Sequence, residues 1–130
     1  MRLMVCYDGS NVAKDAIGLA VELGQQLDGS VSLVRSISAK RADDVVGVEG
    51  IEADLESAAE RVAASGLPVD THLLIRGGSP GEDLTVFANE NRVDYLIIGI
   101  KRRSKVGKIL FGSTAQYVIL KAESPVITVK

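Results

Sequence analysis

The sequence DYLIIGI, residues 94–100, indicates what kind of sheet this chain forms. Its apolar residues stand at consecutive positions instead of alternating with polar ones. Such a run is typical of a strand that is covered on both faces, as the strands of parallel sheets are. The stretch therefore predicts an α/β protein in which residues 94–100 form a central strand.

The segments around this run alternate between short β-rich stretches and longer stretches with helical spacing of apolar residues. The expected strands are residues 3–7, 30–37, 69–75, 94–100 and 125–130. The expected helices are residues 13–27, 48–62, 80–88 and 112–119. Gly29 and Gly66 are expected to end the first two helices, and Ser79-Pro80-Gly81-Glu82 has the cap, proline and glutamate of a helix start. Residues 39–47 are expected to form a polar loop.

This order of segments predicts one domain over residues 1–130, a usual domain length. Its fold class is α/β: a doubly wound, Rossmann-like, five-stranded parallel sheet in strand order 3-2-1-4-5, with helices on both faces. Ligands of such sheets bind beyond the carboxyl ends of the strands, where the strand order reverses. The loops at residues 8–10 and 100–111 are therefore the first places to expect a site.

The composition excludes several classes of protein. Hydrophobic residues make up 46% and the net charge is −2, so the chain has no overall attraction to nucleic acid or to anionic membranes. No run approaches the roughly 20 apolar residues of a membrane helix, and the apolar run in MRLMVCYDGS at the start is too short for a signal peptide, so we expect a cytoplasmic protein. One cysteine and one histidine make zinc chemistry improbable and exclude an internal disulfide.

The loop that follows residues 94–100 concentrates positive charge. Five of the 15 basic residues lie in residues 101–108, namely Lys101, Arg102, Arg103, Lys105 and Lys108. Gly112-Ser113-Thr114 then places free backbone N–H groups at a helix start, and Gly99 lets a ligand or another backbone come close. A helix end contributes only about 0.3–1 kcal/mol to anion binding, so a polyphosphate would need the basic side chains. The alternative is a solvated loop in which Ser113 or Thr114 only caps the helix.

Other classes of protein with a similar fold need residues in positions or orders that this chain does not have. The loop after the first strand, YDGSNVAK, contains neither G-x-G-x-x-G nor a P-loop. Arg76 stands where a phospho-acceptor receiver domain needs an acidic residue. An α/β-hydrolase needs an Asp and then a His after its G-x-S-x-G serine, whereas the only His of this chain precedes several of the candidate serines. With three Tyr, two Phe and no Trp, the basic loop offers little for nucleic-acid bases to stack on.

The chain resembles the universal stress protein family along its whole length. The residues that carry the resemblance are YDGS with Asp8, the strand end DYLIIG and the GST before the last helix. Nucleotide-binding members share the loop pattern G-x-x-G, nine residues, then G-[ST]. Gly99, Gly112 and Ser113 match it, whereas Arg102 occupies the second glycine position. The run R-R-S-x-V-G-K, residues 102–108, looks like a recurrent variant of this loop.

This resemblance implies a regulatory protein that binds ATP or a related adenine nucleotide. Mg²⁺ is expected to bind together with ATP. Asp8 would face the adenine or ribose, and the strand end near Arg35 and Ser36 would line the base pocket. Residues 99–113 would hold the phosphates. The expected nucleotide-binding residues are Cys6, Tyr7, Asp8, Ser36, Ile98, Gly99, Arg102, Arg103, Lys105, Gly107, Lys108, Gly112, Ser113 and Thr114.

Two positions allow two interpretations each. Arg102 either blocks the close approach that glycine permits or contacts phosphate directly through its guanidinium. In the first case the chain is a dimeric interaction module without nucleotide, and the resemblance implies a homodimer paired through the last strand at Val126, Ile127 and Val129. Asp8 is either a ligand contact or a turn residue that caps the first helix with Ser10.

Few other residues point to catalysis or binding. ATP hydrolysis has the weakest support, because Asp8 is the only acidic residue placed near the expected phosphates; slow turnover is compatible with this, and efficient catalysis is not indicated. Cys6 is expected to be a small buried hydrophobe, and His72 has no evident role. The acidic run is expected to form the solvated face of the second helix; it comprises Glu49, Glu52, Asp54, Glu56 and Glu60.

Overall fold

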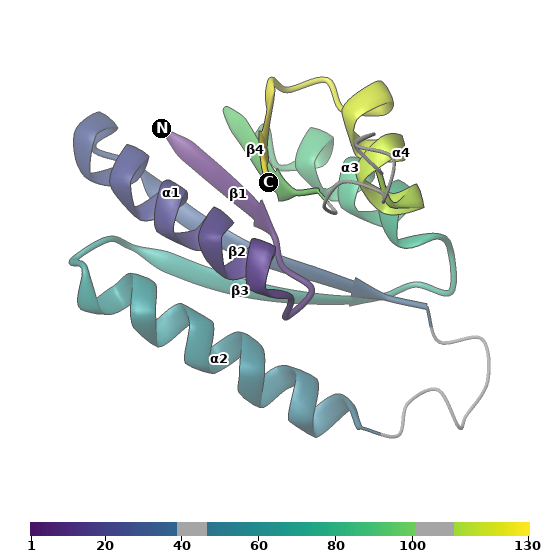
Figure 1. Ribbon diagram of the computed structural model, residues 1–130, viewed down its shortest axis with the longest axis horizontal. Helices are drawn as coiled ribbons and strands as arrows, with labels where there is room; N and C mark the ends of the chain where they lie inside the picture. Colours follow the sequence, from purple (N-terminus) through teal and green to yellow (C-terminus); the bar gives the residue numbers. More distant parts are fainter. Residues whose placement is uncertain (39–46, 101–110) are drawn as a thin grey trace.

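The computed structural model describes residues 1–38, 47–100 and 111–130. Within these residues, parallel strands form one sheet in the order β3-β2-β1-β4-β5 (Figure 1). The strands are β1 (Arg2–Cys6), β2 (Ser30–Ile37), β3 (Val69–Ile75), β4 (Tyr95–Gly99) and β5 (Val126–Val129). The helices are α1 (Asn11–Leu27), α2 (Val48–Ala64), α3 (Pro80–Glu90) and α4 (Ser113–Lys121). The predicted fold class and strand order are confirmed.

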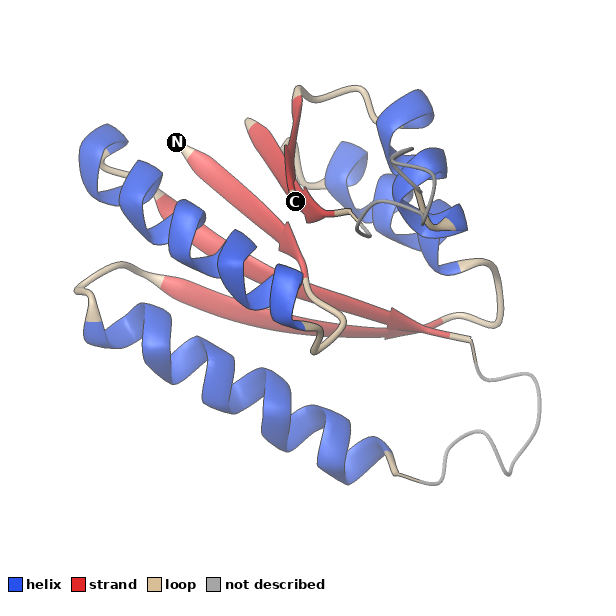
Figure 2. Ribbon diagram, in the orientation of Figure 1, coloured by secondary structure: helices blue, strands red, loops and turns tan. Residues whose placement is uncertain are grey.

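The sheet is the middle layer of a three-layer structure (Figure 2). Helices α1 and α2 cover one face and α3 and α4 cover the other, so each face has its own apolar core. Successive β1 residues alternate between these cores: Leu3 and Val5 pack under α1 and α2, whereas Met4 and Cys6 pack under α3 and α4. This alternation decides which side chains can reach a site on either face.

Strand ends differ slightly from the prediction. Tyr7 lies beyond β1, yet its N–H still donates to the Val34 carbonyl at 2.9 Å. Ile100 lies beyond β4, and its N–H donates to the Val129 carbonyl at 2.8 Å. Both residues therefore continue the direction of their strands toward the same edge of the sheet.

Helix starts follow their capping residues. The Ser10 hydroxyl accepts the Ala13 N–H at 3.2 Å at the start of α1. The Ser79 hydroxyl accepts the Glu82 N–H at 3.3 Å at the start of α3, and Pro80 is the first helical residue, as predicted. These two caps occupy backbone donors that would otherwise be free.

One helix end is not what we expected. Asp28, and not Gly29, takes the left-handed conformation that closes α1, with φ of +52°. Gly29 is required for another reason, because a Cβ there would lie 2.9 Å from the Met1 carbonyl oxygen. Gly66, with φ of +89°, does end α2 as predicted. In the part of the chain that the structure describes, no helix is long and apolar enough to cross a membrane.

Candidate functional site

A cavity of about 360 Å³ opens where the carboxyl ends of β1, β2 and β4 meet the N-terminal ends of α1, α3 and α4. This is the edge of the sheet at which doubly wound proteins bind ligands, and the volume lies within the range of small-molecule sites. Its lining residues are Cys6, Tyr7, Asp8, Ser10, Val12, Ala13, Val34, Ser36, Pro80, Leu84, Ile98, Gly99, Gly112, Ser113, Thr114 and Ala115.

The cavity brings together every predicted site residue that the structure describes. They are Cys6, Tyr7, Asp8, Ser36, Ile98, Gly99, Gly112, Ser113 and Thr114. The other predicted residues, Arg102, Arg103, Lys105, Gly107 and Lys108, lie outside the described residues. Sequence analysis missed the walls formed by the starts of α1 and α3, although the capping signals at Ser10 and Ser79 mark both starts.

The N-terminus of α4 provides the donors of this cavity. Gly112 is the N-cap residue, with φ of −64° and ψ of 158°, and no described side chain accepts a hydrogen bond from the first-turn amides. Ser113 and Thr114 stand inside the helix, so the interpretation that one of them only caps it is wrong. Among the described residues, a serine hydroxyl accepts from one first-turn amide of α1 and one of α3, whereas Gly112 offers no such acceptor to the first-turn amides of α4.

Residue 99 must be glycine because α1 packs closely against it. A Cβ at this position would lie 2.7 Å from Val12 Cγ1 and 3.1 Å from the Val12 carbonyl carbon. Of the two expected reasons for glycine here, the structure contains the close approach of another backbone. Gly99 therefore allows the start of α1 to pack on the end of β4, and both Gly99 and Val12 line the cavity.

Asp8 makes the turn between β1 and α1. Its Oδ1 accepts the Ser10 N–H at 2.9 Å, which is the turn role we considered from the sequence. The same carboxylate is exposed and lines the cavity. Asp8 therefore shapes the loop and presents a negative charge at the end of the cavity formed by β1 and β2.

Cys6 lines the cavity as a neutral thiol. Burial, reinforced by the negative charge of Asp8, raises its pKa from an ordinary value of 9.0 to about 12. The side chain is 6% exposed and belongs to the core under α3 and α4. Such a thiol is not activated for nucleophilic attack, which agrees with the expectation of a small buried hydrophobe.

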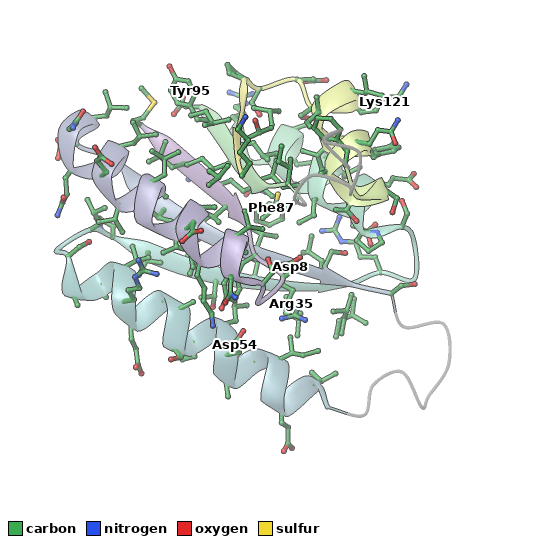
Figure 3. All side chains as sticks on the ribbon, in the orientation of Figure 1. Asp8, Arg35, Asp54, Phe87, Tyr95 and Lys121 are labelled. Atoms are coloured by element: carbon green, nitrogen blue, oxygen red, sulfur yellow. The ribbon has the colours of Figure 1, made fainter. Side chains whose placement is uncertain are left out.

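The opposite face of the sheet closes the same edge with a polar cluster of Tyr7, Arg35 and Asp54. The Tyr7 hydroxyl is hydrogen bonded to the Asp54 carboxylate, and burial and this bond raise the pKa of Tyr7. Asp54 Oδ2 lies 3.9 Å from Arg35 Nη1. Figure 3 shows Arg35 and Asp54 near Asp8, at the carboxyl end of β1.

Two expectations from the sequence are wrong at this cluster. Arg35 does not line the cavity, because alternation along β2 places it on the α2 side while Ser36 faces α3. Asp54 is not simply part of a solvated helix face, since it reaches inward to Tyr7 and Arg35. The sequence does contain the signal that distinguishes Arg35 from Ser36: consecutive residues of a strand point to opposite faces of the sheet.

A buried carboxylate lies behind Ser36. Asp83, in the first turns of α3, is 7% exposed, and its Oδ2 accepts a hydrogen bond from the Ser36 hydroxyl at 3.3 Å. Sequence analysis did not single out Asp83, because the acidic start of a helix is explained by the helix dipole alone. Ser36 thus connects the cavity to a charge that does not line it.

His72 packs on the α3 side without lining the cavity. Its ring centroid lies 4.7 Å from that of Phe87, and Nε2 lies 3.2 Å from Asp70 Oδ1. Among residues 1–38, 47–100 and 111–130, no three His, Cys, Asp or Glu side chains are grouped as a metal site.

The fold defines a doubly wound α/β protein, and its cavity lies at the switch point where such proteins bind small molecules. The family model of the universal stress protein family matches residues 1–130, and the chain belongs to this family.

Three known proteins illustrate the relationship. A universal stress protein from Thermus aquaticus, described as lying in the QAH/OAS sulfhydrylase 3'region, is 29% identical over 98% of this chain and 97% of its own length. A solved universal stress protein from Archaeoglobus fulgidus superimposes with a TM-score of 0.85 at 33% identity, covering 100% of this chain and 98% of its own. Another solved structure from Archaeoglobus fulgidus, a universal stress protein in complex with dAMP, has a TM-score of 0.80 and 30% identity, with 100% and 98% covered.

Proposed function

We propose that this chain is a regulatory protein that binds an adenine nucleotide in the cavity at the carboxyl ends of β1, β2 and β4. The observation that carries the proposal is the pairing of uncapped amides at the α4 end with hydrogen-bond acceptors at the β1 and β2 end of one cavity. The Archaeoglobus fulgidus relative solved in complex with dAMP supports adenine as the base.

The charges along the cavity orient the nucleotide. Phosphate is attracted to the first-turn amides of α4, where the helix dipole adds about 0.3–1 kcal/mol. Near the ends of β1 and β2, the carboxylate of Asp8 and, behind Ser36, that of Asp83 repel phosphate and favour groups that donate hydrogen bonds. The phosphate therefore points toward α4 and the base toward the ends of β1 and β2.

The identity of the nucleotide depends on the basic loop. ATP with Mg²⁺ fits the number of positive charges among Arg102, Arg103, Lys105 and Lys108, which could neutralise a polyphosphate beyond the α4 amides. These residues lie outside the described part of the chain, so their role stays a prediction from sequence. Hydrolysis is not part of the proposal, because Asp8 is held in its turn by the Ser10 amide.

Calorimetric titration with AMP and with ATP plus Mg²⁺ tests the site. Gly112→Asp should weaken AMP binding more than tenfold for two reasons. Its carboxylate would accept hydrogen bonds from the amides that the phosphate needs, and its negative charge would repel the phosphate. The backbone at Gly112 suits an ordinary N-cap residue, so this variant should fold. Gly112→Asn is the matched control for size, and it should lose less affinity. No heat with either nucleotide at millimolar concentration would contradict the proposal.

A second property has its own observation, the exposed edge at β5. This strand ends the sheet and carries Val126, Ile127 and Val129, each only partly buried. We propose that two copies pair through this edge to form a cytoplasmic homodimer. Light scattering at micromolar concentration should give a dimer that Ile127→Lys shifts toward monomer. Leu120→Lys, on a side chain of α4 that is 71% exposed, is the control and should leave the dimer intact.

A further inference from the structure

The hydrogen bond between Ser36 and Asp83 has a direction that the chemistry decides. A carboxylate only accepts hydrogen bonds, whereas a hydroxyl has one proton to donate and lone pairs to accept with. The Ser36 proton is therefore committed to Asp83 Oδ2, at 3.3 Å. What Ser36 can offer the cavity is an acceptor.

Asp83 lies at the start of a helix, behind the cavity. It is the fourth residue of α3, near the positive end of the helix dipole. It is 7% exposed and does not line the cavity, and its hydrogen bond with Ser36 connects it to a residue that does. Asp83 is thus a positioning residue that fixes the rotation of the Ser36 hydroxyl.

The end of the cavity near Ser36 consequently presents acceptors from two strands. Asp8 supplies a carboxylate after β1, and Ser36 supplies the oxygen of a hydroxyl near the end of β2. The first turn of α4, which also lines the cavity, supplies backbone donors. A ligand whose phosphate occupies the α4 end must therefore bring a hydrogen-bond donor to Ser36.

We propose that Ser36, oriented by Asp83, makes the site select purine nucleotides with an amino group at C6 over those with a carbonyl oxygen there. This inference rests on the proposed adenine-nucleotide function and adds the means of selection. An amino group donates to the Ser36 oxygen, whereas a carbonyl oxygen would face another acceptor and leave both unpaired. Sites that match a donor in this way reject the analogue that lacks it.

The test compares AMP with IMP, which differ on the ring edge around C6. We expect the protein to bind AMP about tenfold more tightly than IMP, the effect of roughly one hydrogen bond. In Asp83→Asn the side-chain amide can donate to Ser36, which frees the hydroxyl proton for the cavity. The ratio of AMP to IMP affinity should then fall about five- to tenfold, because the same oxygen can now donate to IMP.

Two further variants separate this effect from general damage. Ser36→Ala removes the hydroxyl and should bring the ratio close to one even if Asp83→Asn fails to fold. Asp70→Asn makes the same chemical change on β3, outside the cavity, and should leave the ratio unchanged. If AMP binds and both cavity variants keep the original ratio, the selection mechanism is overturned while nucleotide binding stands. If neither nucleotide binds the unaltered protein, the proposed function itself fails.

Discussion

At the carboxyl ends of β1 and β2, the two faces of the sheet differ: one is closed by polar contacts and the other borders a cavity. Under α1 and α2, Tyr7 and Arg35 meet Asp54 and close the edge with a hydrogen bond and an ion pair. Under α3 and α4, their sequence neighbours Asp8 and Ser36 border an open cavity. Of the adjacent residues Arg35 and Ser36, the first thus forms an ion pair on one face and the second borders the cavity on the other, because side chains alternate along a strand, whereas Tyr7 takes part in both.

The same truncation on the two faces should give the largest difference. Leu33 is fully buried in the core under α1 and α2, whereas Leu84 is 4% exposed and forms a wall of the cavity. We expect Leu33→Ala to lower the free energy of unfolding by about 3–4 kcal/mol and Leu84→Ala by only about 2 kcal/mol, because water can enter beside the latter. Urea unfolding measures both, and equal losses would show that the cavity wall is packed like the core.

Alkaline pH should act on the cavity side through Cys6. Its pKa rises from 9.0 in ordinary surroundings to about 12 in the folded protein, so the unfolded chain releases this proton first. The contribution to stability is complete below pH 9 and is lost as pH rises toward 12, by on the order of 1 kcal/mol per pH unit. Between pH 8 and 10, unfolding free energies should therefore fall more steeply for the unaltered protein than for Cys6→Ala. Parallel curves would contradict this.

An Asp→Asn exchange on the closed face should have a smaller effect of a different kind. Asp54→Asn weakens the contact with Arg35, whose side chain is 21% exposed while that of Asp54 is 43% exposed. We expect a loss of about 0.5–1 kcal/mol in unfolding free energy, since partly exposed ion pairs contribute little. The AMP affinity should not change, in contrast to the altered selectivity of Asp83→Asn. A change in affinity would mean that the two faces are coupled.

The smallest effect should come from capping the open helix. Gly112→Ser gives α4 the side-chain acceptor that α1 and α3 already have, and should add a few tenths of a kcal/mol to the unfolding free energy. The same hydroxyl competes with the phosphate for an amide, so AMP affinity should fall. Thermal melting and titration of one preparation check both signs, and a gain in affinity would exclude the α4 amides as the phosphate site.

The sequence predicted the architecture because its signals are local. The consecutive apolar residues of β4, the cap at Ser79 and the glycine at residue 66 each indicate one element, and their order determines the sheet. The loops at the carboxyl edge followed from the general rule for parallel sheets. The resemblance to the universal stress protein family then implied the individual residues, and the nine of them that the structure describes line one cavity.

The interactions that the sequence did not predict join elements distant along the chain. Asp54 meets Tyr7 and Arg35 only because α2 packs over β1 and β2, and Asp83 meets Ser36 only because α3 packs behind β2. The sequence left open whether a ligand or another backbone approaches Gly99, and only the packing of α1 shows the approach of Val12. Helix position, and not residue type, determines all three, so periodicity and spacing do not contain them.

Tyr7 gives this protein a built-in optical probe. The chain has no tryptophan, so tyrosine emission is not masked by a stronger fluorophore. Tyr7 borders the cavity on one side and is hydrogen bonded to the Asp54 carboxylate on the other. The ring packs in the core under α1 and α2, so a ligand that enters the cavity lies beside residue 7 and reaches the ring through this residue. Its binding can therefore be followed in unlabelled protein, and Tyr7→Phe would identify which of the three tyrosines reports it.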